Sequence, residues 1–117
     1  MSDIQRLEVG PRMSEACIFN RVVYLAGQVA ADPTADVVGQ TQQVLAAIDR
    51  LLAQAGSDKS RILSAQVFLA DIADFPKMNS VWEPWVVPGA TPARATVQAA
   101  MASPAYKVEI KVIAAQR

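Results

Sequence analysis

The chain has 117 residues, of which 52% are hydrophobic, and its 11 basic and 11 acidic residues balance to a formal net charge of zero. It contains no histidine and a single cysteine, Cys17, which excludes an internal disulfide, a Ser/His or Cys/His nucleophilic relay and a histidine- and cysteine-based zinc site within one chain. No stretch reaches the roughly 18 apolar residues that a membrane helix needs and no signal-peptide pattern opens the sequence, so we expect a cytoplasmic protein with one domain over residues 1–117.

The first quarter of the sequence predicts three short strands. Residues Ile4–Val9 alternate in polarity and end at Gly10-Pro11, which is typical of an edge strand. Residues Glu15–Phe19 and Val22–Gln28 are β-branched, aromatic or small, and are separated by Asn20-Arg21. We therefore expect these two strands to be antiparallel, with a tight connection.

A long amphipathic helix is the most clearly predicted element. Apolar and small residues recur at helical spacing, and Asp36 and Gly56 suit its N-cap and the left-handed position after its end. The apolar stripe consists of Val37, Thr41, Val44, Ile48, Leu51, Leu52 and Ala55, and the polar face carries Gln40, Gln43, Asp49, Arg50 and Gln54. A single apolar stripe predicts a helix that lies on a sheet.

The second half of the chain predicts a strand, a helix and two more strands. Ile62–Leu69 reads as a strand, and Asp74 is expected to open a helix that Pro84 and Pro88-Gly89 shorten. Two strands follow within residues 91–112. The order of elements predicts an α+β fold in which both helices cover one face of a sheet, and other copies of the chain could cover the opposite face.

Arg94 lies in the first of these last two strands. Strand alternation puts Arg94, Thr96 and Gln98 on one side, and in the next strand it puts Lys107, Glu109 and Lys111 on one side. One interpretation is that both polar rows face solvent. The other is that Arg94, which follows the Thr91-Pro92 turn without an acidic neighbour in sequence, binds a carboxylate through its planar guanidinium.

Three segments carry a family resemblance. The segment "TPARATVQAAMASPAYKVEIKVIAA", together with "GPRMSEACIFNRVVYLAGQVA" and "MNSVWEPW", resembles the RidA/YjgF family, whose archetype is the reactive intermediate imine deaminase. The "RMS" and "VWEPWVVPG" pieces are similar to a branch distinct from the archetypal deaminases. The resemblance implies a chorismate-mutase-like α+β fold with a mixed sheet, a homotrimer with a ligand cleft at each subunit interface, and no cofactor or metal.

The same resemblance implies roles for individual residues. The carboxylate-binding arginine of the family falls on Arg94, and the acid proposed to orient or activate water falls on Glu109. The further positions implied for substrate binding are Gly27, Gln28, Asn79, Thr96 and Met13. Two of them depart from the archetypal pattern, because Arg12-Met13-Ser14 stands where a tyrosine is usual and Thr96 replaces a cysteine.

These residues favour hydrolysis of reactive enamine or imine intermediates of amino-acid metabolism to 2-keto acids and ammonia. Imine carbon is already electrophilic, so orientation and one proton acceptor suffice, and neither histidine nor metal is needed. The alternative is a non-catalytic protein that binds small keto acids in the same cleft. A third possibility, RNA binding or cleavage, is disfavoured by the zero net charge and the lack of a basic run, so we expect neither a nucleic-acid nor a membrane partner.

Overall fold

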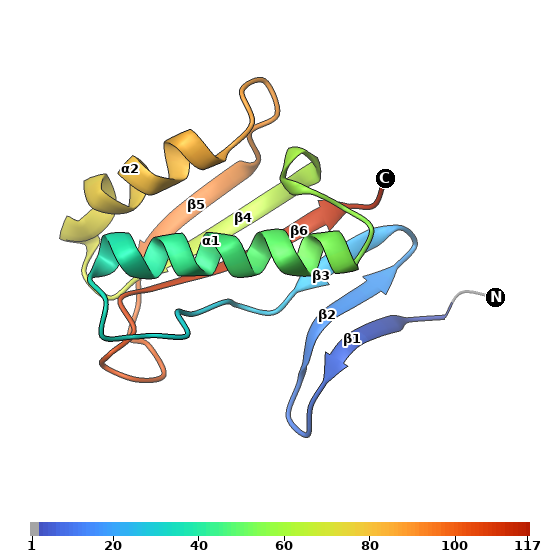
Figure 1. Cartoon of the computed structure of the whole chain (residues 1–117), viewed down its shortest axis with the longest axis horizontal. Helices are drawn as coiled ribbons and strands as arrows, with labels where there is room; N and C mark the ends of the chain where they lie inside the picture. Colours follow the sequence, from blue (N-terminus) through green and yellow to red (C-terminus); the bar gives the residue numbers. More distant parts are fainter. Residues whose placement is uncertain (1–2) are drawn as a thin grey trace.

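One six-stranded sheet carries two helices on one of its faces (Figure 1). The computed structural model describes residues 3–117. The main elements are β1 (Gln5–Val9), β2 (Ser14–Phe19), β3 (Val22–Leu25), α1 (Val37–Gln54), β4 (Ile62–Leu69), α2 (Phe75–Trp85), β5 (Ala93–Gln98) and β6 (Val108–Ala115). The strand order is β1-β2-β3-β6-β4-β5, and the β4–β5 pair is parallel whereas the other pairs are antiparallel. The predicted α+β class with a mixed sheet and both helices on one face is confirmed.

Three predicted strands differ from the structure in extent or in place. The strand expected over Val22–Gln28 ends at Leu25, because the chain then turns to β6, where Gln28 and Ile110 exchange two backbone hydrogen bonds of 2.9 and 3.1 Å. The two strands predicted within residues 91–112 are consecutive in sequence but do not pair. They are β5 and β6, and β4 lies between them.

Helix α1 begins and ends as its sequence predicts. The Asp36 carboxylate accepts a 2.8 Å hydrogen bond from the backbone N–H of Gly39, and Gly56 has a φ of 76° just beyond the helix end. The whole predicted apolar stripe is buried. The helix therefore lies on the sheet as expected, with its N-terminal turn fixed by a side-chain cap.

Gln40 was expected on the polar face of this helix, and that expectation is wrong. Its side chain is fully buried. Its Nε2 donates to the carbonyls of Pro33, Ala35 and Ala105 at 3.0–3.1 Å, and its Oε1 accepts a 2.9 Å bond from the N–H of Lys107. These bonds satisfy the buried amide and tie the start of α1 to the segment that leads into β6.

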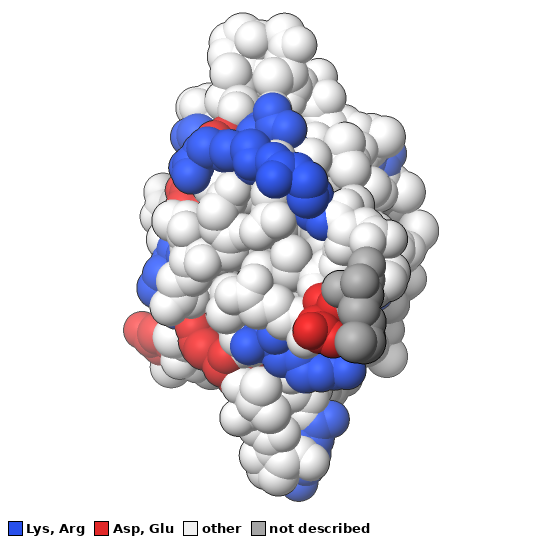
Figure 2. Space-filling view, turned by 90° about the vertical axis from the view of Figure 1, so that its right-hand side faces the viewer, with Lys and Arg blue, Asp and Glu red and all other residues white. Residues whose placement is uncertain are grey.

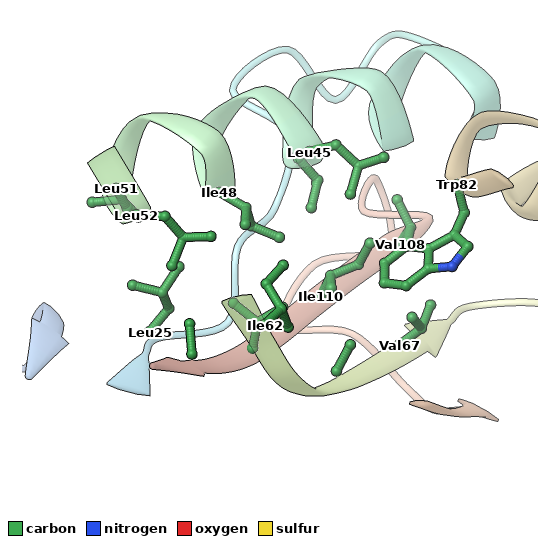
Figure 3. Packing of buried hydrophobic residues seen from close by; sticks show 14 of the residues in the cluster. Leu25, Leu45, Ile48, Leu51, Leu52, Ile62, Val67, Trp82, Val108 and Ile110 are labelled. Carbon is green, nitrogen blue, oxygen red and sulfur yellow. The ribbon is translucent and has the colours of Figure 1, made fainter. Parts of the chain in front are cut away.

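The core lies between α1 and the inner face of the sheet. Figure 3 shows Leu45, Ile48 and Leu52 pointing from α1 toward the strands, with Trp82 beside them from the direction of α2. The sheet contributes buried residues that include Leu25, Ile62, Val67, Val108 and Ile110. Neither helix in the described part of the chain is long and apolar enough to cross a bilayer.

The N-cap of α1 gives a first prediction about stability. Asp36→Ala removes the acceptor for the Gly39 N–H, and we expect it to lower the free energy of unfolding by about 1 kcal/mol. Asp74→Ala is the matched control, because Asp74 precedes α2 but its side chain makes no capping hydrogen bond. Urea unfolding at one protein concentration measures both changes. Equal losses in the two variants would contradict the capping role.

Candidate functional site

The structure places the Arg94 side chain on the helix-covered face of the sheet. Arg94 of β5, Ala65 of β4 and Val112 of β6 form one row of paired residues across the three strands. Ala65 and Val112 are buried beneath the helices. Residues paired across strands point to the same face. Thr96, two residues along, shares this face, whereas Val97 is 42% exposed. The interpretation that the Arg94 row faces solvent is therefore wrong, since the apolar row of β5 is the open one.

Residues of α2 surround the half-buried Arg94 guanidinium. Its Nη1 donates a 2.8 Å hydrogen bond to Oδ1 of Asn79. Its central carbon lies 5.1 Å from the ring centre of Trp82 and 5.5 Å from that of Phe75, which is within the range of cation–π attraction. One face of α2 thus fixes this side chain through an amide and two aromatic rings.

Arg94 retains most of its capacity to bind an anion. A guanidinium has five N–H donors, and the bond to Asn79 uses one of them. The ion pairs among residues 3–117 are Arg50–Glu8 and Arg117–Asp58, so no carboxylate of the described residues lies within the 4.0 Å distance of an ion pair with Arg94. Burial lowers the pKa of its guanidinium, and the nearby charge of Glu83 opposes that shift. Arginine nevertheless stays protonated, because its ordinary pKa lies far above neutral pH.

Thr96 adds an unsatisfied polar atom on the same face of β5. Its Oγ1 is buried and has no hydrogen-bond partner in the described part of the chain. Buried hydroxyl groups normally have partners, and an orphaned one often marks a place where a ligand or water binds. Thr96 thus lies two residues from Arg94 on the same covered face of β5, and Asn79 of α2 is bonded to Arg94.

Glu109 lies on the opposite, open face of the sheet. Phe68 of β4 pairs with Glu109 on one side and with the exposed Val97 on the other, which puts this row on the uncovered side. An added Cβ at Gly27 would lie 2.1 Å from Oε2 of Glu109. A side chain at position 27 would thus occupy the place of the carboxylate, which explains the need for glycine there.

A pocket of about 440 Å³ surrounds the Glu109 carboxylate. Four of the residues that the sequence predicted for the site line it: Met13, Gly27, Gln28 and Glu109. The remaining lining residues are Glu15, Ala26, Val29, Ala102 and Tyr106. The sequence analysis missed Glu15 and Tyr106, and the only signal for Glu15 was its place in an alternating strand next to the predicted Met13.

The predicted site residues therefore form two groups within one chain. Arg94 and Thr96 of β5 lie on the covered face, with Asn79 of α2 bonded to Arg94, and the group around Glu109 lies on the open face. A single small molecule cannot contact both groups of the same chain through the sheet. Either the two groups act independently, or the Arg94 group of one copy and the Glu109 group of a second copy together form one site.

The open face of the sheet is suited to contact with another copy. One row of paired residues on this face runs across β2, β3 and β6 and consists of Cys17, Tyr24 and Ile113. Tyr24 is 44% exposed and Phe19, at the end of β2, is 39% exposed. Large apolar side chains gathered on an uncovered sheet face are typical of a protein–protein interface.

Charges are mixed over the face of the molecule that Figure 2 shows. Figure 2 shows two groups of basic side chains on this face, separated by uncharged surface and with acidic side chains beside them. Each of the two ion pairs, Arg50–Glu8 and Arg117–Asp58, joins an exposed arginine to an acid.

Residues 3–117 also contain no cluster of three or more histidine, cysteine or acidic side chains placed to hold a metal ion.

Comparison with known proteins identifies relatives over almost the whole chain. Residues 4–116 match the model of a family described as Endoribonuclease L-PSP. The chain is 49% identical over 112 residues to a RutC family protein of Haemophilus ducreyi, covering 96% of each chain. It is 36% identical over 114 residues to the 2-iminobutanoate/2-iminopropanoate deaminase of Capra hircus, covering 92% of this chain and 82% of that protein. The crystal structure of a YjgF family member from Neisseria meningitidis superimposes with a TM-score of 0.94 at 45% identity, covering 98% of this chain and 96% of that one.

Proposed function

Because this chain belongs to the YjgF/RidA family, described as Endoribonuclease L-PSP, we propose that it hydrolyses 2-imino acids, and the enamines that tautomerise to them, to 2-keto acids and ammonia. The observation that carries the proposal is the Arg94 guanidinium. It is held by Asn79 and two aromatic rings, has no acidic partner among residues 3–117, and has donors free for a carboxylate. The deaminase of Capra hircus, at 36% identity, supports the choice of reaction.

Arg94 and Glu109 take complementary roles in this reaction. Arg94 binds the substrate carboxylate through two parallel N–H···O bonds, which also fixes the plane of the imine. Glu109 accepts a proton from water as the water oxygen bonds to the imine carbon, and the electron pair of the C=N bond moves to nitrogen. Glu109 returns this proton to the nitrogen to give the carbinolamine. Glu109 then takes the hydroxyl proton as the C=O bond forms and passes it to the nitrogen as the C–N bond breaks, which releases ammonia and leaves the 2-keto acid.

The proposed site is shared between two protomers of a homotrimer. Arg94 and Glu109 lie on opposite faces of one sheet, so the anchor and the base that act on one substrate come from different copies. The apolar side chains on the open face, among them Tyr24 and Val97, support its burial against a neighbour. In a closed ring every protomer then contributes Arg94 to one site and Glu109 to another.

Mixing two inactive variants tests this arrangement. We expect Arg94→Ala and Glu109→Gln each to lose the deamination of imino acids formed by an amino-acid oxidase. After the two variants are unfolded together and reassembled, random assembly regenerates complete sites and returns about a quarter of the wild-type activity. The assay follows 2-keto acid formation in competition with semicarbazide, which traps the imine.

Two outcomes would count against the proposal. If the mixed sample remains inactive although native mass spectrometry shows mixed oligomers, both residues act within one chain. If the wild type binds 2-ketobutyrate but deaminates no imino acid, the protein binds carboxylates without turnover. The double variant Arg94→Ala/Glu109→Gln, mixed with itself, provides the baseline for the reassembly.

A further inference from the structure

The pocket around Glu109 contains a second carboxylate, that of Glu15 from β2. Gln28, whose side chain is 8% exposed, donates through Nε2 to Oε1 of Glu15 at 3.1 Å and to the carbonyl of Ala26 at 3.0 Å. Both amide hydrogens of Gln28 are therefore used. A buried amide thus fixes the Glu15 side chain in the pocket wall.

The acidic groups of this pocket lack partners in the described part of the chain. Oε2 of Glu15 and both carboxylate oxygens of Glu109 accept no hydrogen bond and join no ion pair within residues 3–117. No lysine or arginine lines the pocket, and apolar Met13 and Val29 form part of its wall. Two carboxylates that line one pocket with no lysine or arginine among the lining residues attract a bound positive charge.

A count of charges at the composite site indicates what would bind there. This step depends on the proposed function, in which Arg94 of the neighbouring copy and the substrate carboxylate meet at the pocket. The two carboxylates of the pocket and that of the substrate contribute three negative charges, and the guanidinium contributes one positive charge. Among the groups that line the site two negative charges remain, and a neutral substrate side chain leaves them without a partner there. Lys111, two residues from Glu109 on the same open face of β6, lies outside the lining of this pocket and forms no ion pair with Glu109.

We propose that the preferred substrates are 2-imino acids whose side chain carries a cationic group, and that Glu15 binds that group. Oxidation of a basic amino acid at its α-carbon is the class of reaction that supplies such imines. Glu15 then determines specificity, whereas Glu109 acts on water. Acidic side chains are disfavoured, because they would add a fourth negative charge to the site.

Imines derived from arginine and from citrulline form a matched pair of probes, since their side chains have similar size and differ in charge. We expect the wild type to favour the arginine-derived imine by about tenfold in kcat/KM, the ratio expected for one charged hydrogen bond. Glu15→Gln keeps an acceptor for Gln28 and should reduce this ratio about tenfold. Glu8→Gln removes the same charge from an exposed strand outside the pocket and should leave the ratio unchanged.

Binding measurements keep this test separate from the test of catalysis. Calorimetry with 2-keto-5-guanidinovalerate and its ureido analogue reports the same charge preference without turnover. If the wild type binds the guanidino acid more tightly than the ureido acid and Glu15→Gln loses this preference, the assignment is supported even when no imine is hydrolysed. Equal affinity of the wild type for both acids overturns it, as does an equal loss for both probes in Glu15→Gln, because Glu15 would then not contact the side chain.

Discussion

We expect replacement of Arg94 by lysine to lower kcat/KM for the proposed 2-imino acid substrates by about 100-fold, and replacement by alanine by about 1000-fold. Lysine keeps the charge but is a point donor, so it cannot form two parallel bonds to a carboxylate. It also loses the planar contact with the rings of Phe75 and Trp82 that orients the guanidinium. The carboxylate then rotates, and the imine carbon no longer meets the activated water in the productive geometry.

The loss should be specific to function. Arg94 lies at an edge strand and makes one side-chain hydrogen bond, so we expect the free energy of unfolding of Arg94→Lys to stay within about 1 kcal/mol of the wild type. Arg50→Lys, at an exposed ion pair with Glu8, is the matched control and should change kcat/KM by less than about twofold. Wild-type activity in Arg94→Lys would show that bidentate binding is not required.

Gly27→Ala is expected to reduce kcat/KM by about 100-fold with little loss of stability. The backbone cannot withdraw, since the neighbouring Gln28 exchanges two hydrogen bonds with Ile110 of β6. The new Cβ would lie 2.1 Å from Oε2 of Glu109 and 2.9 Å from its carboxyl carbon. The end of the Glu109 side chain must therefore move, and the carboxylate leaves the position in which we propose that it acts as the base.

A double-mutant cycle separates this effect from a general disturbance of the site. In the Glu109→Ala background the clash is absent, so adding Gly27→Ala should cause no further loss of activity. Independent, additive losses from the two substitutions would show that Gly27 acts through some other contact. Thermal unfolding of each variant checks the expectation that stability changes by less than about 1 kcal/mol.

The sequence predicted the elements of the fold well, because periodicity and end signals are local properties. Helix α1 could be located from its stripe, from Asp36 and from Gly56, and β4 has the bounds that its composition suggests. Gln40 could not be placed in this way. Its burial depends on Ala105 and Lys107, which lie far along the chain and supply partners that no local pattern reveals.

The site was predicted less completely, for a reason of geometry. Alternation shows that Arg94 and Thr96 share a side of their strand, but it does not show which side the helices cover. That depends on the place of β4 between β5 and β6 and on the parallel β4–β5 pair, which are properties of the whole sheet. Glu15 went unnoticed because its position in the pocket is fixed by Gln28, which lies in the connection after β3 and is 13 residues away in sequence.

The position of Arg94 and Glu109 on opposite faces of one sheet has a consequence for how the protein behaves on dilution. If each catalytic unit needs two chains, an isolated chain has no turnover of its own, and specific activity falls once the total concentration drops below the dissociation constant of the assembly. In that range the observed rate depends on more than the first power of the amount of protein. Expression level would then regulate this chemistry more steeply than it regulates an enzyme that works as a single chain.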